Sequence, residues 1–330
     1  MDKKILFVID EIEFKYFELN KLVTNFWLIW EFLKRGFDVK ITTKKHLYLL
    51  ENNAYTLCFD TKILNDNIIY KKEEIHSKIN DFSIVFFRPD PPVDIDYINA
   101  CYIFDFVDCK KTFVINNPCE VKNFNEKFHA NFFPEFLPKN IVTSSKELIK
   151  EFVKKEGDCV LKPLNRCFGS GVFYLKADDK NINSIILNAT NNETTLVMVQ
   201  KKINSKVNGD KRVLIIGEKV FDECVMKLAG KDDFKFNTHS DQFFAPSSLS
   251  KQEREMAQKI AKTLSTKGLY MVGLDVMEGK ILEINVTSPC YFIKEINSFY
   301  NSNFENKIMD TLLNIIEIHF ATQNDKILIG

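Results

Sequence analysis

The first third of the chain alternates between short apolar runs and longer segments in which apolar residues recur at helical spacing. Such runs are typical of buried strands, and the longer periodic segments are typical of helices that cover a sheet. Strands are predicted over residues 4–9, 39–42, 82–87 and 112–115, and helices over residues 19–33 and 95–107. Gly36 follows the first helix as a C-terminal cap signal. The alternation predicts an open α/β sheet over about the first 120 residues.

The middle of the chain predicts a smaller α+β unit. Ser144 and Glu147 stand at the spacing of a capping box ahead of a helix over residues 148–155, and Gly157 ends this helix. Strands are predicted over residues 159–164, 172–176 and 196–203, with a polar helix before the third. Residues 165–171 form a glycine-bearing loop between the first two strands.

The last third predicts strands, one long helix and a hairpin. Strand patterns cover residues 212–216 and 219–228, and a helix covers residues 251–264. A hairpin is predicted over residues 273–286, before a closing helix. No repeat or low-complexity linker separates these parts, so we expect them to pack into one body.

The composition of the 330-residue chain excludes several function classes. Its 45 basic and 45 acidic side chains give a formal net charge of zero, which disfavours a general nucleic-acid binder or a protein of anionic membranes. The eight cysteines include no CxxC pair and no histidine at zinc-ligand spacing, so we expect no zinc site. The first apolar run is too short for a signal peptide, and no run approaches a membrane-spanning length, so we expect a soluble, cytoplasmic protein.

The predicted hairpin carries the most informative polar residues. Glu283 and Asn285 are two apart on a strand and therefore point to the same face. A three-residue turn at residues 278–280 would place Asp275 opposite Glu283 on that face, whereas a two-residue turn would place it on the other. Carboxylate and amide oxygens suit Mg²⁺ that is bound jointly with phosphate. A solvated polar strand face is an equally good interpretation of the spacing.

Lys162 and the loop after it are a candidate phosphate site. Gly169, Ser170 and Gly171 lie in this loop, where backbone N–H groups can surround a phosphate that a lysine on the preceding strand neutralises. The spacing matches no established nucleotide fingerprint, and two glycines in a hairpin turn are the more common interpretation.

Two further basic residues are candidates for a site. Lys127 falls in a helix predicted over residues 121–131, and a surface lysine without function is the alternative. Arg212 begins a strand just after Asp210, and a guanidinium there suits a carboxylate or a developing phosphoryl charge. The sequence alone favours a surface ion pair at this position.

Several catalytic patterns are missing from the sequence. No G-x-S-x-G motif is present, and the five histidines lie in unrelated contexts, so no serine or histidine chemistry is predicted. No glycine fingerprint follows Ile9, which argues against a dinucleotide-dependent dehydrogenase.

Six segments carry motifs that follow one another in a defined order. They span residues 87–92, 125–127, 161–164, 209–214, 272–275 and 283–289. In this order and at these separations they resemble bacterial-type glutathione synthetase of the ATP-grasp superfamily. The last segment, Glu-Ile-Asn-Val-Thr-Ser-Pro, is the most specific, and the resemblance runs from the first strand to the last helix.

The resemblance implies an ATP-grasp fold in three parts. Residues 1–122 would form an N-terminal open α/β domain that binds substrate, residues 123–203 a small α+β lid, and residues 204–330 a C-terminal α+β domain. ATP would lie between the last two. The implied reaction is the ATP-dependent condensation of γ-glutamylcysteine with glycine, in a homo-oligomer that is a dimer or a tetramer.

The resemblance also implies roles for individual residues. Two Mg²⁺ or Mn²⁺ ions would bind with ATP at Asp275, Glu283 and Asn285. The nucleotide would be bound by Lys127, Lys162, Gly169, Ser170, Gly171, Gln200, Lys201, Lys202, Ile203 and Asp210. The substrates would be bound by Arg88, Arg212, Asn237, Asn285, Ser288 and Pro289. Arg212 and Lys162 would be the catalytic residues.

This sequence departs from the family pattern in its loops. Arg166, Cys167 and Phe168 stand where the family has glycine or small residues, and Lys235 replaces an arginine ahead of Asn237. Lys294 replaces another arginine. We expect an active ligase with altered loop kinetics. The alternatives are an ATP-grasp ligase for another acid and amine, and a nucleotide-binding module without catalysis, against which the complete set of metal ligands argues.

Overall fold

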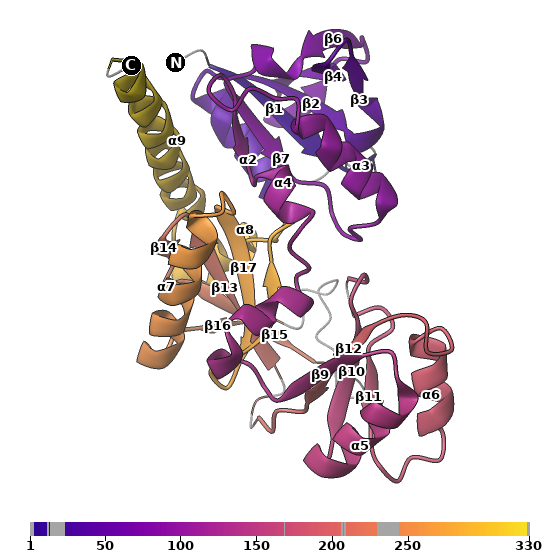
Figure 1. Cartoon of the computed structure of the whole chain (residues 1–330). Helices are drawn as coiled ribbons and strands as arrows, with labels where there is room; N and C mark the ends of the chain where they lie inside the picture. Colours follow the sequence, from indigo (N-terminus) through magenta and orange to yellow (C-terminus); the bar gives the residue numbers. More distant parts are fainter. Residues whose placement is uncertain are drawn as a thin grey trace.

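The computed structural model describes residues 3–11, 13, 24–167, 169–205, 207, 209–229 and 244–328. Three sheets form three bodies, and the four-stranded sheet lies at the end of the molecule opposite the N-terminal sheet (Figure 1). No helix among these residues is long and apolar enough to cross a membrane.

The N-terminal sheet has eight strands, and its main path runs β3-β4-β2-β1-β7-β8. The strands are β1 (Lys4–Ile9), β2 (Asp38–Thr43), β3 (Leu47–Leu50), β4 (Asn53–Leu64), β5 (Asn67–Tyr70), β6 (Ile75–Lys78), β7 (Ile84–Phe87) and β8 (Phe113–Ile115). The first, second, seventh and eighth strands pair in parallel, as the alternation predicts. The antiparallel strands β3 to β6 are not predicted by the sequence pattern.

Helix α2 (Thr24–Lys34) covers one face of this sheet. Its buried residues include Phe26, Ile29 and Phe32, which recur at helical spacing. Phe32 packs against Phe86 of the sheet, and their ring centres are 5.4 Å apart. Gly36 takes a positive φ of 76° two residues after the helix, which supports the predicted C-terminal signal. Helix α3 (Ile95–Phe104) ends three residues before its predicted limit.

The second sheet has four antiparallel strands in the order β11-β10-β12-β9. They are β9 (Asn140–Thr143), β10 (Cys159–Pro163), β11 (Phe173–Leu175) and β12 (Val197–Lys201), with helices α5 (Lys146–Glu156) and α6 (Ile182–Ala189). The capping box predicted at Ser144 and Glu147 is wrong. Ser145 is the N-cap and accepts from the backbone N–H of Leu148 at 3.4 Å, because the helix begins one residue later than a cap at Ser144 requires.

The third sheet has six strands, with the path β16-β15-β13-β17-β18 and β14 paired to β13. They are β13 (Gly209–Ile216), β14 (Lys219–Val220), β15 (Cys224–Leu228), β16 (Phe244–Ser247), β17 (Met271–Met277) and β18 (Lys280–Asn285). The strand predicted over residues 219–228 is therefore two strands. Helices α7 (Lys251–Ser265), α8 (Ile293–Tyr300) and α9 (Phe304–Leu328) belong to this body, and α9 runs up beside the N-terminal sheet (Figure 1).

The hairpin between β17 and β18 turns over two residues and contains a bulge. Met277 pairs with Lys280 across Glu278 and Gly279, whose φ angles of 47° and 69° suit a tight two-residue turn. The three-residue alternative is wrong. A register shift between Asp275 and Val276 still brings Asp275 opposite Glu283, because the bulge inserts one extra residue after the turn.

The segment between the first and second sheets is less helical than predicted. Helix α4 covers only Pro118–Val121, and the 3₁₀ helix η3 begins at Phe128. Lys127 therefore lies in the loop ahead of η3, and the prediction of a continuous helix over residues 121–131 is wrong. Asn125 caps this turn, because its Oδ1 accepts from the backbone N–H groups of Lys127 and Phe128.

Candidate active site

A cavity of about 740 Å³ is lined by residues from all three bodies. The residues predicted from sequence that line it are Arg88, Lys127, Lys162, Gly169, Gln200, Lys201, Lys202, Ile203, Asp210, Arg212, Asp275, Glu283, Asn285, Ser288 and Pro289. Ser170 and Gly171 are outside the lining. Asn237 and Lys235 lie outside the described residues.

Asp275 is the centre of a buried charge network on the third sheet. Arg212 donates to its two oxygens, from Nε at 2.7 Å and from Nη2 at 3.3 Å. Lys227 approaches the same carboxylate at 3.0 Å. Burial would raise the pKa of Asp275, but the charges of Arg212 and Lys227 outweigh it and hold the pKa well below its usual range. Asp275 therefore stays an ionised carboxylate.

Strand register places these charges together. Arg212 pairs with Asp275 across β13 and β17, and Asp210 pairs with Lys227 across β13 and β15. Gly273 gives Arg212 room, because a Cβ there would lie 3.1 Å from its Cδ. The surface ion pair that the sequence favoured for Arg212 is wrong, since this arginine is only 7% exposed and pairs inside the cavity.

Lys227 is a residue of the cavity that sequence reasoning misses. Its Nζ bridges Asp275 and Asp210, at 3.1 Å from Asp210 Oδ2. Asp210 Oδ1 is buried without a hydrogen-bond partner among the described residues, and burial together with the charge of Asp275 raises the pKa of Asp210 to about 6 although Lys227 opposes the rise. A lysine in the otherwise apolar strand Cys224–Leu228 was the available signal, because a buried lysine needs partners.

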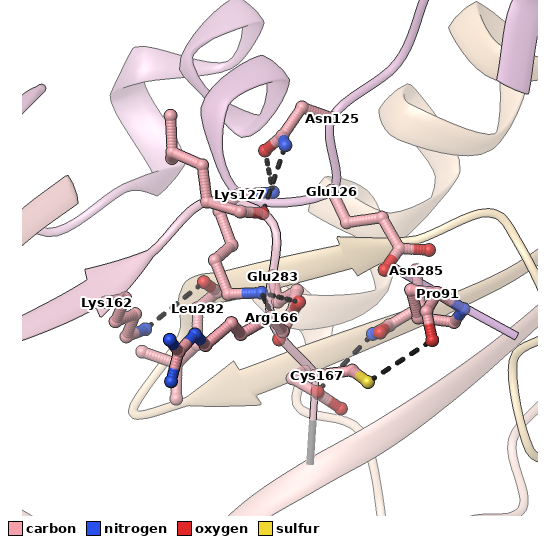
Figure 2. Close-up of polar contacts among 12 residues, drawn as sticks. Pro91, Asn125, Glu126, Lys127, Lys162, Arg166, Cys167, Leu282, Glu283 and Asn285 are labelled. Atoms are coloured by element: carbon pink, nitrogen blue, oxygen red, sulfur yellow. Dashed lines mark hydrogen bonds and ion pairs between the residues drawn. The ribbon is translucent and has the colours of Figure 1, made fainter. Parts of the chain in front are cut away.

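Lys127 joins the loop after β10 to the hairpin. Its Nζ donates to Glu283 Oε1 at 2.8 Å and to the backbone carbonyl of Arg166 at 2.7 Å (Figure 2). Asn125 Nδ2 donates to the carbonyl of Leu164 at 3.1 Å. Two neighbouring residues of the same turn thus hold the loop that follows β10.

Glu126 is a second residue that the sequence did not single out. Its Oε1 accepts from the backbone N–H of Val286 at 2.8 Å and from the N–H and hydroxyl of Thr287 at 3.0 and 2.9 Å. Burial and the nearby charge of Glu283 raise the pKa of Glu126. Glu126 fixes the end of β18 and therefore the position of Asn285.

Lys162 lies on β10 and donates to neutral acceptors. Its Nζ lies 2.7 Å from Gln200 Oε1 and 3.4 Å from the carbonyl of Leu282. Burial lowers the pKa of Lys162 to about 8, with Lys127 adding repulsion and Glu283 opposing both. Gln200 Nε2 is buried without a partner among the described residues, so this corner offers both a cation and a free amide donor.

Arg88 occupies the N-terminal end of the cavity and is only 1% exposed. Its guanidinium donates to Asn25 Oδ1, to the carbonyl of Pro289 at 3.0 Å and to Ser288 Oγ at 3.4 Å. Burial lowers its pKa from the ordinary arginine value. Arg88 therefore holds the 288–289 turn against the first sheet.

Two carboxyl groups near Arg88 also line the cavity and were missed. Burial raises the pKa of Glu13 to about 8, although it accepts from Asn25 Nδ2 at 2.8 Å. Burial and the charge of Asp10 raise the pKa of Asp90 to about 6. Asp90 lies two residues after Arg88 in the segment 87–92, but the resemblance implies no role for it, whereas Glu13 stands in no recognisable motif and only folding brings it to Arg88.

The hairpin residues fit a hard divalent cation. Asn285 Nδ2 lies 3.4 Å from Asp275 Oδ2, and Glu283 stands opposite Asp275 in the ladder. Both carboxylates are balanced by basic side chains, so this face already stabilises a positive charge at each of them. No group of three His, Cys, Asp or Glu residues is gathered in the described part of the chain. The amide oxygen of Asn285 and phosphate oxygens would complete such a site.

Two family models match most of the chain. The model described as the N-terminal domain of prokaryotic glutathione synthetase matches residues 4–122, and the model of its ATP-grasp domain matches residues 126–301. The matches meet within the connecting segment between the first and second sheets.

Similar proteins give the same picture. The glutathione synthetase of Vibrio parahaemolyticus is 33% identical over 294 residues, which cover 88% of this chain and 92% of that protein. The glutathione synthetase of a Nostoc species is 36% identical over 286 residues, covering 83% and 87%. The crystal structure of a D-cycloserine synthetase superposes with a TM-score of 0.65 at 12% identity, covering 95% of this chain and 99% of the other, a likeness that concerns the fold.

Proposed function

The chain belongs to the prokaryotic glutathione synthetase family, and from this premise we propose that it joins γ-glutamylcysteine to glycine at the expense of ATP, giving glutathione, ADP and phosphate. A carboxylate is a poor electrophile. One oxygen of the cysteinyl carboxylate attacks the γ-phosphorus of ATP, and ADP leaves. The glycine amine then attacks the acyl carbon and loses a proton, and phosphate leaves.

The side chains of the cavity supply positioning and charge for this reaction. Lys127 and Lys162 bind the phosphates, and the backbone of residues 200–203 meets adenine, with Asp210 nearby. The loop of Gly169, Ser170 and Gly171 closes over the phosphates. Arg212 stabilises the transferring phosphoryl group and the tetrahedral intermediate, which is where a fixed guanidinium is most effective.

The peptide substrate binds at the other end of the cavity. Arg88 shapes this end by holding Ser288 and Pro289, and Asn237 belongs to the same proposed set. Asp275, Glu283 and Asn285 would hold Mg²⁺ or Mn²⁺, as two ions with ATP, and the metal supplies charge neutralisation at the phosphates.

One observation carries the proposal. Arg212, Lys227 and Asp275 form a buried network with contacts of 2.7 to 3.3 Å on the wall of the cavity. Burying three charged groups costs free energy that a merely structural sheet avoids with apolar residues. Their place beside Glu283 and Asn285 suits a site in which phosphoryl charge develops.

The test is product formation by purified protein with ATP and Mg²⁺. We expect ADP and glutathione in equal amounts when γ-glutamylcysteine and glycine are both present, and Asp275→Asn should abolish both. ATP binding without turnover on this pair would contradict the proposal. Other acids and amines would then separate a different ligase from a binding module.

We further propose a cytoplasmic dimer or tetramer, by analogy with the family. Sedimentation velocity at micromolar concentration tests the assembly, and a monomer across the concentration range would contradict it.

A further inference from the structure

Arg166 is a basic residue of the cavity that has no role in the reaction proposed above. It lies in the loop after β10 and lines the cavity. Its side chain makes no hydrogen bond or ion pair with any residue that the structure describes. A permanent charge thus faces the cavity without a partner.

Three basic side chains of the cavity are already paired with carboxylates of the protein. Lys127 is paired with Glu283 at 2.8 Å, and Arg212 with Asp275 at 2.7 Å. Lys227 is shared between two carboxylates. These charges stabilise the protein's own acids before any ligand binds.

The remaining basic side chains are also engaged or partly neutral. Lys201 reaches Glu156 at 3.4 Å, and Lys202 lies over the ring of Tyr174. Arg88 is closed in by the 288–289 turn, and Lys162 is a buried amine with neutral acceptors. Arg166 is therefore the guanidinium that remains available to a polyanion among the described residues of the cavity.

The backbone that carries Arg166 is held at three points. Lys127 Nζ donates to its carbonyl at 2.7 Å, and the thiol of Cys167 donates to the carbonyl of Pro91 at 3.5 Å (Figure 2). Asn125 Nδ2 donates to the carbonyl of Leu164 at 3.1 Å. The side chain starts from a fixed place next to Lys127 and the hairpin.

Gly171 provides the space for the Arg166 side chain. A Cβ on Gly171 would lie 3.2 Å from Arg166 Nη1 and 3.3 Å from its Cδ, and the φ of Gly171 is +70°. The Arg166 side chain therefore occupies space that Gly171 leaves open because it has no side chain.

We propose that Arg166 binds the terminal phosphates of ATP in this chain, an inference that rests on the proposed function. The carbonyl of Arg166 shares the Lys127 ammonium with Glu283, which places the residue at the metal end of the cavity, where the β- and γ-phosphates lie in the proposed reaction. A guanidinium matches two phosphate oxygens and stays protonated at every working pH.

Nucleotide affinity tests this role without relying on turnover. ATP, ADP and AMP compete with a fluorescent ATP analogue on wild type, Arg166→Gln, Arg166→Lys and Arg254→Gln. The last is a matched control, because Arg254 lies on α7 in an exposed pair with Asp222. Arg166 is exposed, so its substitution leaves the core intact.

The expected pattern is specific to phosphate. Arg166→Gln should weaken the binding of ATP by about 10- to 100-fold and the binding of AMP by less than about twofold, because Arg166 contacts only the terminal phosphates. Arg166→Lys should recover part of the loss, and Arg254→Gln should match wild type.

Three outcomes overturn the inference or its premise. Unchanged ATP affinity in Arg166→Gln, or an equal loss for AMP, overturns the role of Arg166 even if wild type makes glutathione. Wild type that binds no ATP overturns the proposed function itself, and the inference with it.

Discussion

The two walls of the cavity are built in different ways. On the hairpin wall, Arg212, Lys227 and Asp275 stand on adjacent antiparallel strands and neutralise one another in buried pairs. On the loop wall, residues 164–167 are held through the carbonyls of Leu164 and Arg166 and through the thiol of Cys167. The Arg166 side chain has no partner among the described residues. Strand register fixes the charges of the hairpin wall, whereas the loop wall carries the unpaired guanidinium of Arg166.

We propose that this difference separates catalysis from nucleotide binding. Catalytic charge is most effective when it needs no reorganisation, which strand register provides. A loop that must admit and release a nucleotide gains from contacts that water can replace. Substitutions on the hairpin wall should therefore cost both stability and turnover, and those on the loop wall mainly nucleotide affinity.

The largest effect is expected at Arg212. Arg212→Met removes the paired guanidinium and leaves Lys227 as the one basic partner of Asp275 among the described residues. We therefore expect turnover to fall about 1000-fold and the free energy of unfolding to fall by about 3 kcal/mol. Initial rates and urea unfolding measure the two effects. A variant with wild-type stability and turnover would show that the hairpin wall is not the catalytic wall.

Lys227 and Lys211 offer a matched pair on the same sheet. Lys227→Met leaves two carboxylates of the cavity less balanced, whereas Lys211→Met removes the partner of Glu253, which Lys211 contacts at 2.8 Å outside the cavity. Both should lose about 1–3 kcal/mol of stability, but only Lys227→Met should lose turnover, by about 100-fold. Equal turnover in the two variants would contradict the assignment of Lys227.

The pH dependence of ATP binding should report Lys162. Its pKa of about 8 lies below the ordinary 10.5, and phosphate binding favours the charged form, so ATP affinity should fall about tenfold as the pH rises from 7.5 to 9.5. Lys162→Arg stays charged and should flatten the profile.

The unliganded protein should show the opposite trend in stability. Between pH 8 and 10.5 the unfolded chain keeps the lysine proton that the folded protein has lost, so this group makes stability rise with pH. Thermal melts of wild type and Lys162→Met test the sign. If Lys162→Met retains the full rise, another group is responsible.

The smallest effect is expected at Asn125. Asn125→Ala removes the contact to Leu164 and the cap of the Lys127 turn, so the loop wall should loosen. We expect the KM for ATP to rise about two- to fivefold with kcat almost unchanged, since each lost hydrogen bond is worth about 1 kcal/mol. Steady-state kinetics measure the split, and a loss confined to kcat would argue against an affinity role for this wall.

Local periodicity predicted the parallel strands of the first sheet and the hairpin of the third sheet, because a strand that is buried on one or both faces needs apolar residues at regular positions. It missed β3 to β6, where burial is partial and the strands are exposed in part. It also extended a helix through Lys127, because the apolar spacing there reflects packing of a turn stabilised by Asn125.

The site was predictable where one strand carries several of its residues. Glu283 and Asn285 share a face through simple alternation, but the bulge that brings Asp275 to them depends on the register of two strands. Lys227 and Glu13 stand in no motif, and Glu126 lies in the 125–127 segment without an implied role, so only tertiary structure assembles these three residues from separate elements.

The most direct test of the central claim follows an oxygen atom. γ-Glutamylcysteine labelled with ¹⁸O in its cysteinyl carboxylate is incubated with ATP, glycine and the protein, and the inorganic phosphate is examined by mass spectrometry. Carboxylate activation by ATP predicts one ¹⁸O atom in each phosphate released. Glutathione formed with unlabelled phosphate would contradict an acyl phosphate intermediate, and with it the role proposed for Arg212 and the hairpin wall.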